Sequence, residues 1–77
     1  MTLDQLGIHH KAIIVCIKGE SMLRKRLLEM GLIPGTEVEI LRVAPMKDPL
    51  VIYIRHYTFT LRKEDASLIK VEEVSHV

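Results

Sequence analysis

The segment Arg24–Leu41 constrains the fold of this 77-residue chain more than any other part of it. Its sequence, RKRLLEMGLIPGTEVEIL, holds the end of a helix, a helix cap, a turn and the beginning of a strand. Gly31 suits the left-handed conformation that ends many helices, and Leu32 is then placed to contact Leu27. The dipeptide Pro34–Gly35 predicts a turn. Because these local signals agree, we expect the segment to form one strongly specified unit.

Short strands flank this unit on both sides in the sequence. The helix itself is expected over 20–30, with Leu23, Leu27 and Met30 on one apolar face. Alternating or β-branched apolar residues predict five strands, and two short polar segments predict single helical turns. The expected strands are 11–18, 36–44, 50–55, 57–62 and 68–73, and the expected helical turns are 2–6 and 63–67.

The strand expected over 36–44 changes its apolar face halfway along. Val38 and Ile40 share one face, but Leu41 and Val43 fall on the other. Such a change predicts a β-bulge or a sharp bend, as at the corner of a small barrel. Five short strands in a flat sheet would leave long exposed edges, most of which a barrel removes. The predicted fold is therefore mostly β, a small five-stranded barrel with one α-helix inserted after the first strand and a short N-terminal helical turn.

Length and charge limit the functions open to the chain. Its 77 residues make a single domain, 1–77, with an ordered core expected over about 2–73. The net charge of +1 is too balanced for a protein that binds phosphate backbones, so nucleic acid is not an expected partner. The longest apolar run, 12–17, is too short to span a membrane, and the N-terminus lacks the features of a secretion signal. We therefore expect a cytoplasmic protein.

The sequence carries no recognisable catalytic or metal-binding motif. It has no nucleophile elbow, phosphate-binding glycine loop or H-E-x-x-H helix, so an enzyme is not expected. Cys16, the single cysteine, lies in the apolar run AIIVCI and is interpreted as a small core residue. His9, His10 and Cys16 come nearest to a ligand set, but adjacent histidines in an extended segment point to opposite faces. We expect no required cofactor, only weak or adventitious binding of Fe²⁺ or Zn²⁺.

Two long stretches carry a family resemblance. They are LRKRLLEMGLIPGTEVEILRVAP at 23–45 and DPLVIYIRHYTFTLRKEDASLIKVE at 48–72. Together with the opening TLDQL, they resemble the ferrous iron transport protein A (FeoA) family over nearly the whole chain. The resemblance implies an SH3-like barrel that binds the cytosolic side of FeoB, a membrane Fe²⁺ permease with a G-protein domain, and modulates its activity without catalysis of its own. The membrane would then be reached only through the partner, at its inner face.

Two other functions stay open beside this one. SH3-like domains resembling this chain form the C-terminal part of iron-dependent repressors, which suggests a metal-responsive regulatory module acting in trans. A small barrel can also bind single-stranded nucleic acid, with the aromatic side chains of Tyr53, Tyr57 and Phe59 as stacking platforms. Against this, Tyr57 and Phe59 alternate with threonines as core-facing residues do, which predicts that they pack in or near the core.

The helix offers the first candidate contact surface. Leu28 is expected between Arg24 and Lys25 on the face away from Leu23, and an apolar residue flanked by cations can anchor an acidic or amphipathic partner surface. The alternative is that a wide apolar stripe buries Leu28 and leaves the cations merely solvated. Met46, in the loop 45–49, is the second candidate, with a solvated turn as the alternative.

One residue departs from the family pattern. Where the resemblance implies a glycine in the turn between two strands, this chain has His56. If the turn requires a positive φ, His56 is strained by about 1 kcal/mol or more.

Overall fold

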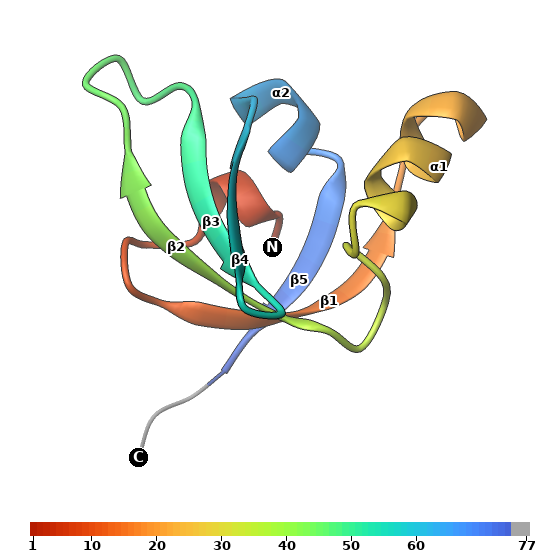
Figure 1. Cartoon of the computed structure of the whole chain (residues 1–77), viewed down its shortest axis with the longest axis horizontal. Coiled ribbons are helices and arrows are strands. Elements are labelled where there is room, and N and C mark those ends of the chain that lie inside the picture. Colours follow the sequence, from red (N-terminus) through yellow and green to blue (C-terminus); the bar gives the residue numbers. More distant parts are fainter. Residues whose placement is uncertain (75–77) are drawn as a thin grey trace.

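In the computed structural model, which describes residues 1–74, five antiparallel strands form one strongly curved sheet in the order β4-β3-β2-β1-β5 (Figure 1). One α-helix lies between the first two strands, as predicted. The elements are η1 (Leu3–Gln5), β1 (Lys11–Ile17), α1 (Ser21–Glu29), β2 (Glu37–Val43), β3 (Leu50–Ile54), β4 (Tyr57–Leu61), α2 (Lys63–Ala66) and β5 (Ile69–Glu73). The mostly β fold class and the position of the helix are thereby confirmed.

The core fills the concave side of the curved sheet. Alternate residues of the strands point into it, because successive side chains of a strand lie on opposite faces. Leu27 and Leu32 add the contribution of α1 and its cap, and Leu3 and Leu6 close the core from the N-terminal side. The strand residues of this core are Ala12, Ile14, Ile17, Val38, Ile40, Leu50, Ile52, Ile54, Leu61, Ile69 and Val71.

The predicted bulge in the second strand is present. Ile40 pairs with Ile52, but the next pair is Arg42 with Val51, so Leu41 is an extra residue on β2. A second irregularity, between Ile14 and Cys16 of β1, was not predicted. Bulges increase local twist and bend a strand, which allows the five strands to curl around one core.

The cap after α1 has the predicted geometry. Gly31 has φ +101°, its N–H donates to Leu28 O at 3.0 Å, and the Leu32 N–H donates to Leu27 O at 3.1 Å. These two bonds satisfy carbonyls that the helix end would otherwise leave unpaired. The Thr36 N–H donates to Ile33 O at 3.1 Å across Pro34–Gly35, where Gly35 has φ +90°, as a tight turn requires.

Three predicted burial assignments are wrong. Cys16, interpreted as a small core residue, is only half-buried and is not part of the core, because the register shift between Ile14 and Cys16 interrupts the alternation of β1. Met30, expected on the apolar stripe of the helix, is 44% exposed, because the helix proper ends at Glu29 and Met30 is its C-cap. Tyr57, expected in or near the core, is 72% exposed, because it pairs with Ile54 at the end of the hairpin, where the sheet extends beyond the core. Phe59, by contrast, packs partly buried against the core.

The two ends of the described chain lie near β5. Val71 donates its N–H to Met1 O at 2.9 Å, and Val74 donates to Lys11 O at 2.8 Å. The backbone pairing therefore reaches one residue beyond each end of the ordered core expected over 2–73, and the remainder, 75–77, lies outside the described residues. Within 1–74, no helix has the length and apolar character needed to cross a membrane.

Candidate functional site

The outer face of α1 carries the first candidate residues. Arg24 and Lys25 are exposed, as is Arg26, so three consecutive cations stand on a nine-residue helix. Leu28 is half-buried and packs against the core. The apolar face of α1 is thus wide enough to include Leu28, and only part of this side chain remains available to a partner.

Two exposed methionines flank these cations, and neither was predicted from the sequence as a contact residue. Met22 is 80% exposed, and Met30 stands eight residues later with Arg26 midway between them. Residues four apart lie on neighbouring turns of one helix side, so Met22, Arg26 and Met30 form a ridge beside the partly buried Leu23 and the buried Leu27. The four-residue spacing of Met22, Arg26 and Met30 in the sequence could have predicted this ridge. Methionine is flexible and polarizable, which suits a surface that adapts to a partner.

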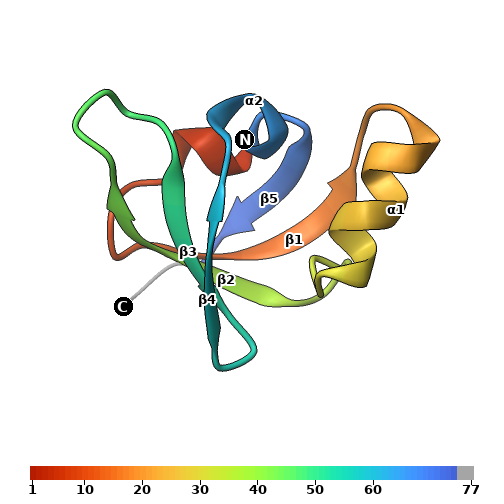
Figure 2. The same cartoon turned by 45° about the horizontal axis from the view of Figure 1, so that its top comes forward.

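A groove separates this ridge from the barrel. Its volume is about 630 Å³, within the range of ligand-sized pockets. One wall comes from α1, and the other comes from the end of β4, the start of α2 and the loop before β3; Figure 2 shows α1 standing on one side of α2 and β4. The lining residues are Arg26, Leu27, Met30, Asp48, Pro49, Thr60, Leu61, Arg62, Glu64 and Asp65.

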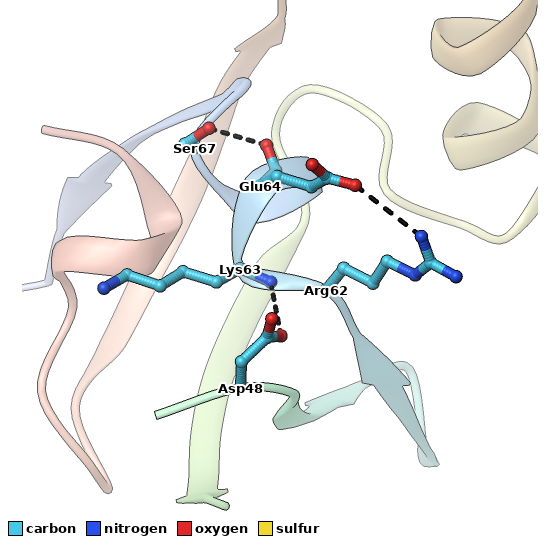
Figure 3. A network of polar contacts seen from close by, with 5 residues as sticks. All are labelled: Asp48, Arg62, Lys63, Glu64 and Ser67. Carbon is cyan, nitrogen blue, oxygen red and sulfur yellow. Dashed lines mark hydrogen bonds and ion pairs between the residues drawn. The ribbon is translucent and has the colours of Figure 1, made fainter. Parts of the chain in front are cut away.

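Polar contacts stabilise the segments of the barrel that line this groove (Figure 3). The Lys63 N–H donates to Asp48 Oδ1 at 2.9 Å, which ties the loop 45–49 to the first residue of α2. Arg62 Nη1 lies 3.6 Å from Glu64 Oε1, and the Ser67 hydroxyl donates to Glu64 O at 2.6 Å. Asp48 thus accepts one of the N–H groups that a helix start leaves unpaired. No sequence signal indicated this contact, because Asp48 and Lys63 lie 15 positions apart.

The loop 45–49 presents the second candidate, Met46, which is 87% exposed. The loop is closed by two backbone bonds, from Ala44 N–H to Pro49 O at 3.1 Å and from Lys47 N–H to Ala44 O at 2.7 Å. A smaller, largely apolar hollow of about 410 Å³ lies beside it, lined in part by Leu6, Ile8 and Val43. Met46 therefore stands out from the surface on a loop that the backbone holds in shape.

The candidate metal ligands do not come together. His9 Nδ1 lies 3.7 Å from Glu39 Oε2 on β2, whereas His10 Nδ1 lies 2.6 Å from Glu73 Oε2 on β5. The adjacent histidines point toward opposite neighbours of β1, and Cys16 is half-buried further along that strand. Across residues 1–74, no three His, Cys, Asp or Glu side chains form a group able to hold a metal ion.

The turn between β3 and β4 contains the residue that departs from the family pattern. Both of its residues are left-handed, with φ +50° at Arg55 and +72° at His56, so the turn does require positive φ. Tyr53 Oη lies 3.3 Å from His56 Nδ1, and Arg55 Nη2 lies 3.5 Å from Thr36 Oγ1. These side chains line a shallow hollow of about 290 Å³ on the convex face of the sheet. They do not form a row of stacked aromatic platforms, because Phe59 is turned toward the core.

Comparison with known proteins gives a consistent result. The family model for the FeoA domain matches residues 1–73. A protein of Porphyromonas gingivalis (strain ATCC BAA-308 / W83), named Fe(2+) transport protein A/Fe(2+) transporter FeoB fusion protein, is 40% identical over 75 residues. This match takes in 97% of the present chain but 9% of the fusion protein, so the chain spans only a small part of that relative.

Solved structures agree in fold. Iron(II) transport protein A from Clostridium thermocellum is 42% identical with a TM-score of 0.91, over 96% of this chain and 46% of that one. FeoA of Stenotrophomonas maltophilia, solved in complex with zinc and named as an SH3 domain protein, is 28% identical with a TM-score of 0.82, over 94% and 89% of the two chains. The SH3-like class is therefore confirmed. A manganese-dependent transcriptional repressor, 13% identical with a TM-score of 0.86 over 96% of this chain and 41% of its own, shares the fold alone.

Proposed function

Since this chain belongs to the FeoA domain family, we propose that it serves ferrous iron uptake by binding the cytosolic side of a FeoB-type Fe²⁺ permease and modulating its activity through protein–protein contact. The observation that carries the proposal is the fused relative, whose name joins the two proteins in one polypeptide. A covalent link keeps two domains at high effective concentration, which is useful when they act on each other. In this proposal the protein is cytoplasmic and reaches the membrane only through its partner.

The proposed role is regulatory and non-catalytic. A bound protein changes its partner's activity only if it binds one state of that partner more tightly than another. The permease would therefore have at least two states of its cytosolic region with different affinities for this domain. The nucleotide cycle of the G-protein domain is the source of those states in our proposal.

We propose the ridge and cations of α1 as the main contact surface. Arg24 and Lys25 are exposed and make no ion pair within the described residues, so their charges are available to an acidic surface. Met22 and the exposed part of Leu28 supply apolar area beside them. Interfaces commonly combine an apolar centre with charged surroundings, and complementary charge raises the association rate. Met46 extends the contact to the loop 45–49 as the second element.

A binding titration against the isolated cytosolic region of the permease tests this surface. The double variant Arg24→Glu/Lys25→Glu is expected to weaken binding by about tenfold or more, because it reverses two charges at the contact. The matched control is Arg42→Glu, which reverses another exposed cation near the end of β2 on the opposite side from α1 (Figure 1). The control should bind like the unmodified protein. If the double variant also does so while remaining folded, α1 is not the contact surface.

No resident metal is part of the proposed mechanism. His10 with Glu73 and His9 with Glu39 each supply two ligands, on opposite sides of β1. Structural zinc sites use four protein ligands, so either pair would bind a divalent ion such as Fe²⁺ or Zn²⁺ only weakly.

A further inference from the structure

The two edge strands of the sheet, β5 and β4, differ in whether another segment covers their outer edge. The outer edge of β5 is covered by the N-terminal residues, since Val71 donates to Met1 O at 2.9 Å and Thr2 forms an antiparallel bridge with Lys70. β4 is the strand at the other edge, paired with β3 alone. In Figures 1 and 2 it forms the last strand of the hairpin, and β5, the next strand on the side away from β3, is not paired with it.

The register shows which backbone groups of β4 are free. A two-residue turn makes Ile54 and Tyr57 a hydrogen-bonded pair, and antiparallel pairs alternate between bonded and non-bonded. Phe59 and Leu61 are therefore bonded to β3, whereas Thr58 and Thr60 direct their N–H and C=O groups outward. No hydrogen bond found outside the sheet within residues 1–74 involves either threonine.

This edge lacks the usual protection against strand pairing. Edge strands are commonly blocked by lysine, proline, a bulge or a covering segment. The sequence of β4, YTFTL, has no charge and no proline, and its register with β3 is continuous over five pairs. Both threonines are exposed, and Thr60 borders the 630 Å³ groove, which leaves open space beside the C-terminal end of β4.

Charge at the ends of β4 selects the kind of strand that fits. Arg55 and His56 precede the strand and Arg62 and Lys63 follow it, so antiparallel pairing with a second copy would bring cations of both copies together. Arg62 already has Glu64 at 3.6 Å, whereas Arg55, whose Nη2 lies 3.5 Å from Thr36 Oγ1, has no ion pair within the described residues. An antiparallel strand places its C-terminal end beside Arg55, which favours an acidic residue there.

We propose that β4 is a strand-addition site that accepts an extended segment of another protein, antiparallel to β4, uncharged in its middle and acidic at its C-terminal end. Main-chain bonds to Thr58 and Thr60 would give affinity, and the acidic end beside Arg55 would fix direction and register. The proposal does not depend on which protein supplies the segment, so it stands or falls separately from the proposed function.

A synthetic peptide tests the site directly on the unmodified protein. The probe is a blocked peptide of five alternating valine and threonine residues followed by two glutamates, and the control peptide carries the glutamates at its beginning. Amide exchange, followed residue by residue by NMR, should be fast at Thr58 and Thr60 and slow at Phe59 in the free protein. Saturating probe should slow exchange at both threonines by about tenfold or more, and the control peptide should bind several-fold more weakly.

A pair of proline variants separates strand addition from other binding. Thr60→Pro removes an N–H that points outward, and the fold should be kept because proline is tolerated in edge strands. Probe binding should weaken by about fivefold, which corresponds to the loss of one net hydrogen bond. Thr60→Val keeps that N–H and should bind normally. Unchanged exchange at Thr58 and Thr60 with saturating probe, or chemical-shift changes confined to α1 and the loop 45–49, would overturn the proposal. Protection of the two threonines that rises with protein concentration alone would also overturn it, in favour of pairing between copies.

Discussion

Replacing His56 by glycine is expected to stabilise the protein. His56 has φ +72° in the two-residue turn between β3 and β4, next to Arg55 at +50°. The left-handed conformation costs an L-residue about 1–2 kcal/mol, because Cβ approaches the following carbonyl oxygen. Glycine has no Cβ and takes this conformation without that cost.

Two effects oppose this gain. Glycine is more flexible in the unfolded chain, which costs about 0.5–1 kcal/mol on folding. The variant also loses the contact of 3.3 Å between Tyr53 Oη and His56 Nδ1, which joins two exposed side chains and contributes little. The net expectation is a rise of roughly 0.5–1 kcal/mol in the free energy of unfolding, and of roughly 2–8 °C in Tm.

Urea unfolding followed by far-ultraviolet circular dichroism measures this difference. The control is Thr58→Gly, which places the same residue in β4 two positions later, where φ is not positive. There glycine should lower the free energy of unfolding by about 0.5–1 kcal/mol. A His56→Gly variant that unfolds at the same or lower urea concentration than the natural chain would refute the reasoning.

Three further predictions concern the core, α2 and metal. Leu27→Ala should cost about 2–5 kcal/mol in urea unfolding, because Leu27 is fully buried beneath the helix cap; a loss below 1 kcal/mol would contradict its assignment to the core. Asp48→Ala should lower stability by about 1 kcal/mol by leaving the Lys63 N–H unpaired, whereas Asp48→Asn keeps an acceptor and most of the stability; equal loss in both would contradict this role. Calorimetric titration with Zn²⁺ should show weak binding that His10→Ala reduces further, and tight one-to-one binding would contradict the two-ligand geometry.

Local sequence signals were sufficient for most of the fold. The cap at Gly31, the turn at Pro34–Gly35 and the extra residue at Leu41 all depend on residues within a few positions of each other. Backbone conformation at such sites is set by glycine, proline and the alternation of apolar residues, which can be read directly. Two of the three wrong burial assignments, at Met30 and Tyr57, fall where an element ends, and periodicity does not show how far the core reaches. The third, at Cys16, falls at the irregularity of β1, which no local pattern indicated.

The candidate contact surface could be predicted only in part from the sequence. Arg24 and Lys25 could be named because a cationic run on a short helix is visible in one dimension. The groove between α1 and β4 could not, because it depends on how far the helix stands from the barrel. The contact of Asp48 with Lys63 and the covering of β5 by Met1 join residues distant in the chain, and no local pattern predicts such pairs. The bare edge of β4 likewise follows from strand order, which the sequence did not provide.

The central claim is that this domain regulates a FeoB-type permease by distinguishing states of its cytosolic region. The most direct test is a binding titration of the domain against that isolated region, loaded in turn with a non-hydrolysable GTP analogue and with GDP. We predict saturable binding whose dissociation constant differs several-fold between the two nucleotide states, because only differential affinity can shift the partner's equilibrium. Equal affinity in the two states, or no saturable binding in either, would contradict the account.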